Sequence, residues 1–301
     1  MWLTFAFGAA IFAGITSILA KIGIKDTDSD LATALRTVVV VIFAWLMVFL
    51  VGSQTSIADV SQKSFVFLIL SGLATGGSWL CYFKAIKLGD INKVVPVDKS
   101  SVVLTMLLAF LLLGETLTLL KVVCMVLIGA GTLMMTLPRH LNTGCRAGVI
   151  EPKRDGRRTD GSKAWLPFAV LSAIFAALTA ILGKIGIADV ESNLGTAIRT
   201  VVVLIMAWLI VMGKGAHKGI PAIGKKNLLF IALSGLATGL SWICYYRALQ
   251  TGPVAIVVPI DKLSIVITVA FGCLFLKEKL TKKSGLGLTL IAAGTLCLLI
   301  P

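Results

Sequence analysis

The stretch WLTFAFGAAIFAGITSILAKIGI, residues 2–24, returns as WLPFAVLSAIFAALTAILGKIGI at residues 165–187. Farther along, SGLATGGSWLCY at 71–82 returns as SGLATGLSWICY at 234–245, and VVPVDKSS at 94–101 returns as VVPIDKLS at 257–264. The same offset of 163 residues separates the members of every pair. Residues 1–138 and 164–301 are therefore two copies of one unit, and each copy is expected to fold in the same way.

The composition is that of a protein whose solvent is lipid. Of the 301 residues, 57% are hydrophobic and only 14% are charged, whereas soluble domains carry about 25% charged residues. Mean hydropathy is +0.98. A spanning helix needs roughly 20 apolar residues, and the continuously apolar runs exclude a transmembrane β-barrel, whose strands alternate. These runs predict ten spans, at about 2–20, 31–51, 64–86, 94–113, 118–137, 165–183, 194–212, 227–249, 254–276 and 282–300.

An odd number of spans in each copy means that the second copy must cross the bilayer in the opposite direction. The predicted fold class is therefore all-α integral membrane, with ten transmembrane helices as two inverted five-helix repeats. Inverted repeats are the construction of carriers whose central site is reached from either side in turn. We expect one repeat at 1–138, a linker at 139–163 and the second repeat at 164–301.

The linker is basic, with the sequence RHLNTGCRAGVIEPKRDGRRTDGSK. We interpret it as a flexible connection, and the alternative is a contact with anionic lipid or a partner. Most of the 28 Lys and Arg residues fall on the linker's side of the predicted membrane, and such residues remain cytoplasmic. This distribution accounts for the net charge of +14, so binding to nucleic acid is not needed to explain it. It predicts a multi-pass protein of the cell (inner) membrane with a cytoplasmic linker and both termini outside; termini inside is the rival placement.

Charged side chains inside the apolar runs are costly in lipid and usually functional. The first copy has a cluster at the cytoplasmic ends of its helices, and the second copy has its counterpart at the external ends, one cluster near each mouth of a pathway. The candidate residues for substrate binding, coupling or gating are Arg36, Tyr82, Lys84, Asp98 and Lys99, with their counterparts Arg199, Tyr245, Arg247, Asp261 and Lys262.

The two aspartates leave two interpretations open. Each could form a buried ion pair that holds its helix, for instance Asp98 with Arg36, or each could be a proton site, a substrate site or a gate. The hydroxyls of Tyr82 and Tyr245, with those of Ser78 and Ser241, could contact a substrate or bridge helices. Pro96 and Pro259 could start their helices, which we favour slightly, or lie farther inside them and free a carbonyl.

Residues elsewhere favour structural roles. Glu115 and Glu278 stand just before the fifth and tenth spans, where a carboxylate meets the positive end of a helix dipole. Gly72, Gly76 and their counterparts Gly235 and Gly239 place small residues four apart for close helix packing. We find no nucleophile–base set, phosphate loop or metal-ligand spacing. The sequence therefore predicts no enzyme, no cofactor and no metal.

The repeated pattern resembles a known family. Each copy has a prolyl segment in its fourth span (VVPVDKSS, VVPIDKLS), then LGETLT at 113–118 or LKEKLT at 276–281, then IGAGTL at 128–133 or IAAGTL at 291–296. This is similar to the drug/metabolite transporter superfamily, specifically its EamA-like permeases, and each half resembles the single-unit bacterial/archaeal transporter family. The resemblance implies a cavity lined by helices 1–4 and 6–9, peripheral helices 5 and 10, and transport of small metabolites. It also implies termini inside, against the charge distribution.

We therefore expect a secondary transporter for a small metabolite or drug-like solute. A passive channel or facilitator and a non-transporting membrane helper protein are the alternatives. The expected partners are the solute and the lipid bilayer, and a homodimer is left open. The basic excess in each cluster points to an anionic or zwitterionic solute.

Overall fold

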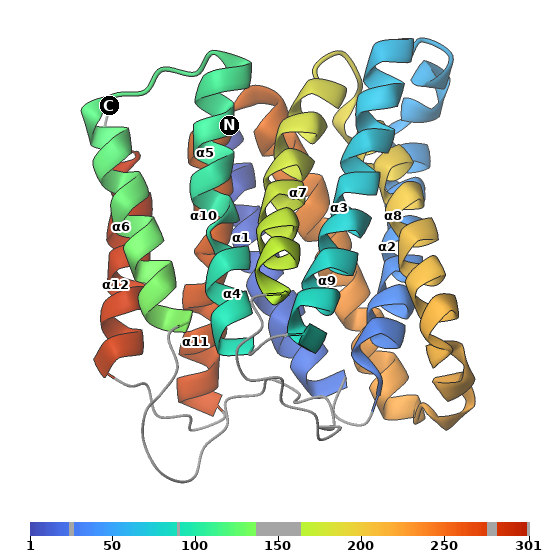
Figure 1. Ribbon diagram of the computed structural model, residues 1–301. Helices are drawn as coiled ribbons and strands as arrows, with labels where there is room; N and C mark the ends of the chain where they lie inside the picture. Colours follow the sequence, from blue (N-terminus) through green and yellow to red (C-terminus); the bar gives the residue numbers. More distant parts are fainter. Residues whose placement is uncertain (24–26, 89–90, 137–163, 276–281, 300–301) are drawn as a thin grey trace, which may run out of the picture.

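The computed structural model describes residues 1–23, 27–88, 91–136, 164–275 and 282–299. Within these ranges the chain is helical, with two short 3₁₀ helices, η1 (Ser53–Ile57) and η2 (Ala216–Ala222). The first half contains α1 (Trp2–Gly23), α2 (Ser29–Val51), α3 (Gln62–Leu88), α4 (Ile91–Lys99), α5 (Ser101–Leu113) and α6 (Leu119–Thr136). The second contains α7 (Trp165–Gly186), α8 (Ser192–Lys214), α9 (Lys225–Thr251), α10 (Val254–Lys262), α11 (Ser264–Phe275) and α12 (Lys282–Cys297). Figure 1 shows them as one bundle.

By length and composition, seven stretches of the described residues can cross a membrane. Six of them lie in α1, α2, α3, α7, α8 and α9, and the seventh runs through α10 into α11. The protein is thus an all-helical, multi-pass membrane protein. The other three predicted spans correspond to α4 with α5, to α6 and to α12, whose described lengths or hydropathies are smaller.

The fourth and ninth predicted spans are interrupted. α4 ends at Lys99 and α5 begins at Ser101, while α10 ends at Lys262 and α11 begins at Ser264. Each interruption directly follows an Asp–Lys pair. Ser100 and Leu263, between the paired helices, keep right-handed helical backbone angles. Each interruption is therefore a one-residue break between two short helices.

The prolines lie inside these short helices and not in their first turns, so our slight preference for helix-starting prolines was wrong. Pro259 is within α10, which begins at Val254 after Pro253 as its N-cap. Pro96 is within α4. The missing N–H of an interior proline leaves the carbonyl four residues earlier without its helical donor, at Ala255 in α10.

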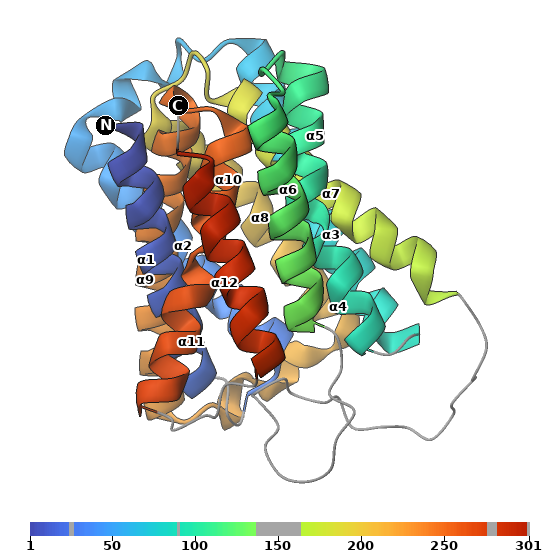
Figure 2. The same ribbon diagram turned by 90° about the vertical axis from the view of Figure 1, so that its left-hand side faces the viewer.

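Helices of one half pack against helices of the other across the bundle. α1 packs against α9 and α3 against α7, so the first helix of each half lies on the third helix of the other. α2 packs on α8, and α6 on α12. In Figures 1 and 2, α1 begins and α12 ends at one end of the bundle, which we call the Trp2 end. α7 runs toward that end while α1 runs away from it, toward what we call the Gly23 end.

Glycines set the distance between several of these helices. A Cβ on Gly72 would lie 2.7 Å from Val202, and one on Gly76 would lie 2.6 Å from Met206, both on α8. The counterparts Gly235 and Gly239 approach Val39 and Phe43 of α2 to 2.7 and 2.6 Å. Close approach through small residues is how helices pack in lipid. The packing role predicted for these four glycines is confirmed.

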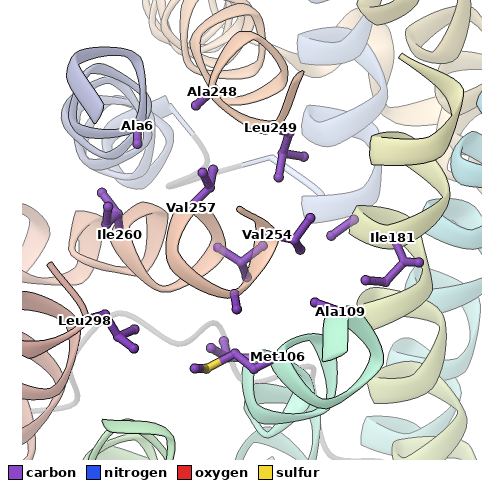
Figure 3. Close-up of a cluster of buried hydrophobic side chains, with 14 of the residues drawn as sticks. Ala6, Met106, Ala109, Ile181, Ala248, Leu249, Val254, Val257, Ile260 and Leu298 are labelled. Atoms are coloured by element: carbon purple, nitrogen blue, oxygen red, sulfur yellow. The ribbon is translucent and has the colours of Figure 1, made fainter. Parts of the chain in front are cut away.

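The largest apolar cluster surrounds α10. Val254, Val257 and Ile260 are buried between α1, α5, α7 and α9, as Figure 3 shows with Ala6, Met106, Ala109, Ile181 and Leu249. Packing against these helices fixes the short helix in place. The Asp261–Lys262 pair at its carboxyl end is thereby held at a defined depth in the bundle.

Candidate functional site

Both halves contribute to one cavity of about 290 Å³ in the middle of the bundle. Its wall combines hydroxyls, aromatic rings and three charged side chains. From the first half come Thr75, Ser78, Trp79, Ser101 and Thr105, and from the second come Thr179, Arg199, Ser241, Trp242, Tyr245, Tyr246, Asp261 and Lys262. A larger hollow near Trp2 has a mainly apolar wall with Lys121 as its charged side chain. The mixed wall of the first cavity makes it the candidate site.

Arg199 is the most deeply buried charged residue on the cavity wall, with 3% of its surface exposed. It lies on α8, yet its hydrogen bonds go to α3 of the other half: Nε donates to Ser71 Oγ at 3.0 Å, and Nη2 donates to Thr75 Oγ1 at 2.6 Å. The guanidinium carbon lies 5.1 Å from the centre of the Trp242 ring and 4.9 Å from that of Tyr246. Both distances fit cation–π contacts. Arg199 therefore joins α8, α3 and α9.

The counterpart Arg36 has different surroundings. The repeat would pair it with Ser234 and Thr238 on α9. Ser234 donates to the Thr16 carbonyl at 3.2 Å and Thr238 donates to Thr16 Oγ1 at 3.3 Å, which repeats the contacts of Ser71 and Thr75 with Thr179. Among the described residues, neither a hydrogen bond nor an ion pair of Arg36 is present. The two arginines are equivalent in the repeat, but their hydrogen-bond contacts differ.

The aspartates pair with the lysines that follow them. Asp261 Oδ2 lies 3.2 Å from Lys262 Nζ, and Asp98 Oδ2 lies 3.8 Å from Lys99 Nζ. Asp98 also accepts a hydrogen bond of 2.7 Å from Ser172 on α7. The Arg–Asp ion pairs considered from the sequence do not occur in the described part of the chain. The aspartate charges are instead neutralised locally, at the two helix interruptions.

Only part of the predicted residue set lies on the cavity wall. Arg199, Tyr245, Asp261 and Lys262 line it. The other six candidates lie outside it. The Lys84 ammonium lies 4.3 Å from the centre of the Phe168 ring, and Tyr82 packs against a cluster with Val94 and Ala169. Arg247 donates a hydrogen bond of 2.9 Å to Gln250. The contacts of Arg36, Asp98 and Lys99 are those given above.

The sequence reasoning missed several wall residues. Thr75 lies among the glycines of α3, and Trp79 and Trp242 directly follow Ser78 and Ser241 in SW pairs. Serine and threonine within a stretch of small residues are usually interpreted as helix-packing residues. Their occurrence in both halves, next to a tryptophan, was the feature of the sequence that could have indicated a binding site.

Hydroxyl groups also connect the halves along α3 and α7. Ser71 Oγ donates to the Thr179 carbonyl at 2.7 Å, and Ser78 and Ser172 donate to each other's carbonyls at 3.1 Å. Ser172 Oγ also donates to Asp98. In α1 and α9 the corresponding bond runs from Ser241 Oγ to the Ala9 carbonyl at 2.9 Å. These contacts fix the walls of the cavity relative to one another.

Glu115 connects the two halves at the Trp2 end in a way that the sequence did not predict. Its carboxylate accepts hydrogen bonds from the Val254 and Ala255 amides at 2.6 and 3.0 Å. It therefore caps α10, in the other half, and not its own following helix as we expected. The negative charge meets the unpaired amides at the start of α10. Glu278, its counterpart, lies outside the described residues.

Lys184 reinforces the same end. Its ammonium donates to the Leu249, Gln250 and Gly252 carbonyls, the last of them at 3.0 Å. A cation at the carboxyl end of a helix is stabilised by the helix dipole. Lys184 thus ties α7 to the connection between α9 and α10, next to the amides that Glu115 caps.

The bond from Glu115 to α10 can be tested by substitution. Glu115→Ala is expected to lower the free energy of unfolding by about 1–2 kcal/mol, the usual worth of such a cap. It should also increase labelling of a cysteine at Ser101, in the cavity, from the Trp2 end. Glu191→Ala is the matched control, because Glu191 caps α8 of its own half with bonds of 2.9 and 3.0 Å. Equal labelling changes in both variants would contradict a role for Glu115 in closing this end.

Within the described residues no group of three or more His, Cys, Asp and Glu side chains is placed to hold a metal ion. The wall offers instead hydrogen-bond donors, a guanidinium, an Asp–Lys pair and aromatic faces. Such a set can bind and release a polar solute through hydrogen bonds and charge, without covalent chemistry.

Comparison with known sequences matches both halves to the same family. The profile of the EamA-like transporter family matches residues 1–137 and 163–300. A Sinorhizobium sp protein named "Uncharacterized transporter in cobO 3'region" is 50% identical over 139 residues, which are 46% of this chain and 99% of that protein. An uncharacterized protein of Methanocaldococcus jannaschii is 35% identical over 99 residues, 33% of this chain and 71% of its own.

A solved structure shares the fold. It is described only as "Crystal structure of protein" and superposes with a TM-score of 0.71 at 18% sequence identity. The match covers 98% of this chain and 95% of the other. The arrangement of helices is thus one already seen by experiment.

Proposed function

Because the chain belongs to the EamA-like transporter family, we propose that it is a secondary transporter that moves a small metabolite across the cytoplasmic membrane by alternating access. The observation that carries the proposal is the central cavity, to which both halves contribute and which borders both helix interruptions. Substrate sites of such carriers lie near the bilayer midplane at the interface of the repeats, where helices are discontinuous. The name of the Sinorhizobium relative, a transporter, supports the same class.

Three observations support two inverted five-helix repeats, with each interrupted pair counted as one span. α1 and α7 run in opposite directions, the helix contacts persist when the halves are exchanged, and a relative of half this length matches over 99% of itself. In this arrangement residues 1–138 and 164–301 are the moving units and 139–163 connects them.

The contacts of the two arginines support a direction of opening. Arg199 binds α3 and Glu115 binds α10, both between halves and both on the Trp2 side of the cavity. Arg36 has no such bond within the described residues. We therefore assign this structure to a state closed at the Trp2 end. In the opposite state Arg36 would bind Ser234 and Thr238, and Arg199 would be released.

The transport proposal is tested in proteoliposomes loaded with isotope-labelled metabolites from a bacterial extract. Mass spectrometry identifies solutes whose efflux depends on the protein. A carrier is expected to show faster efflux when the same unlabelled solute is present outside. Efflux without this acceleration would indicate a passive channel, and no protein-dependent flux for any solute would overturn the transport function.

The proposed orientation places both termini outside and residues 139–163 in the cytoplasm, following the distribution of Lys and Arg. Cys145 provides a natural reporter in a variant without the other cysteines. An impermeant thiol reagent is expected to leave it unlabelled in intact cells and to label it in inverted vesicles. Labelling in intact cells would reverse the orientation.

A further inference from the structure

The charges on the cavity wall do not balance. Arg199 and Lys262 carry positive charge and Asp261 carries one negative charge. The 3.2 Å contact between Asp261 and Lys262 occupies that carboxylate. Arg199 therefore has hydroxyl and aromatic partners but no carboxylate partner in the described part of the chain. An uncompensated charge at membrane depth is unfavourable.

The guanidinium also has unused donors. Nε and Nη2 are bonded to Ser71 and Thr75, whereas Nη1 is buried and has no hydrogen-bond partner. A buried donor without a partner is unfavourable. Arginine binds carboxylates and phosphates through a planar set of donors. An anion that reached Nη1 would offset both the missing hydrogen bond and the missing charge.

Lys99, at the other interruption, lies outside the cavity wall and is paired with Asp98 at 3.8 Å. The carboxylates that could attract a cationic solute are both engaged, Asp261 with Lys262 and Asp98 with Ser172 and Lys99. The local field therefore favours an anion over a cation.

From these contacts we infer that the transported solute is a small organic anion whose carboxylate or phosphate group binds Arg199 and Lys262. This inference rests on the proposed transport function. A volume of about 290 Å³ lies at the lower end of ligand pockets, roughly 300–1,000 Å³, and corresponds to a small metabolite. The rings of Trp79 and Trp242 provide apolar contacts for the rest of the solute.

The test uses the purified full-length protein in lipid nanodiscs and probes of one shape but different charge. Benzoate and phenyl phosphate are the anions, benzamide is neutral and benzylamine is cationic. Binding is followed by tryptophan fluorescence and by the rise in melting temperature that a ligand of the folded state produces. We expect at least one anion to bind, and its identity distinguishes a carboxylate site from a phosphate site.

Variants then locate the site. Arg199→Gln is expected to weaken binding of the anion roughly 10- to 100-fold, as for loss of hydrogen bonds to a charged group. Arg199→Lys should retain part of the affinity. Lys226→Gln removes the same charge from an exposed position at the start of α9 and should leave the affinity unchanged. Lys262→Gln is expected to weaken binding as well, and it replaces the Arg199 variant if that one does not fold.

Two results would overturn the inference: binding of benzylamine or benzamide as tight as that of the anions, or unchanged anion affinity in both Arg199→Gln and Lys262→Gln. The proteoliposome assay separates this failure from failure of the transport function. Flux of neutral or cationic solutes alone would leave a transporter with a different substrate class. Anion binding without any flux would leave a binding site in a protein that does not transport.

Discussion

Replacing Gly131 with valine is expected to separate α6 from α12 and to lower the free energy of unfolding by about 3 kcal/mol or more. A Cβ at Gly131 would lie 2.6 Å from the Gly287 carbonyl oxygen and 2.9 Å from the Ile291 amide nitrogen. These are backbone atoms of α12, so no side-chain rotation relieves the overlap. The melting temperature of the protein in nanodiscs measures the effect.

The matched control is Gly213→Val on α8. A Cβ at Gly213 meets no atom within 4 Å, so its stability should change by no more than about 0.5 kcal/mol. If both variants melted at the same temperature, the close contact between α6 and α12 would not contribute to stability.

Replacing either aspartate at the helix interruptions is expected to slow transport at least tenfold and to shift the carrier in opposite directions. In the alternating-access proposal Asp98 belongs to the charge cluster that closes the Gly23 end, and Asp261 to the cluster that closes the Trp2 end. Asp98→Asn weakens the contacts of Asp98 with Ser172 and Lys99, and should favour opening at the Gly23 end. Asp261→Asn leaves Lys262 without its carboxylate and should favour opening at the Trp2 end.

Cysteines at the equivalent positions Ser101 and Ser264, in a variant without native cysteines, report which end is open. Their labelling by an impermeant reagent, added to one side at a time, is expected to change in opposite senses in the two variants. Asp59→Asn, at an exposed acid after η1, is the control and should alter neither flux nor labelling. Equal loss of melting temperature with no difference in labelling would assign both aspartates to structure alone.

The sequence was sufficient for the features that depend on local composition and on repetition. Apolar runs predict helices in lipid, because every backbone polar group there must be bonded within its own segment. The two copies predict that any contact of one half has a counterpart in the other. The membrane class, the helical fold, the family and the packing role of Gly72 and its counterparts could all be read in this way.

The contacts between halves could not be predicted from the sequence, because the two copies of a motif are alike and do not reveal which of two equivalent residues forms a given bond. Arg36 and Arg199 are equivalent in the repeat, and only the folded bundle shows that Arg199 is hydrogen-bonded across the halves while Arg36 has no such bond among the described residues. Glu115 was expected to cap the helix that follows it, and it caps α10, because the amides of Val254 and Ala255 lie 2.6 and 3.0 Å from its carboxylate oxygens.

The sequence by itself determined that charged residues lie inside the spans, that they occur as Asp–Lys pairs, and that a proline precedes each pair. Only the tertiary structure decided that each pair ends a short helix, and that Arg199 and Lys262 share one cavity with the Ser101 region of the other half. The reason is physical: charge and propensity act along the chain, whereas compensation of a buried charge depends on which distant groups the packing of the helices brings to it.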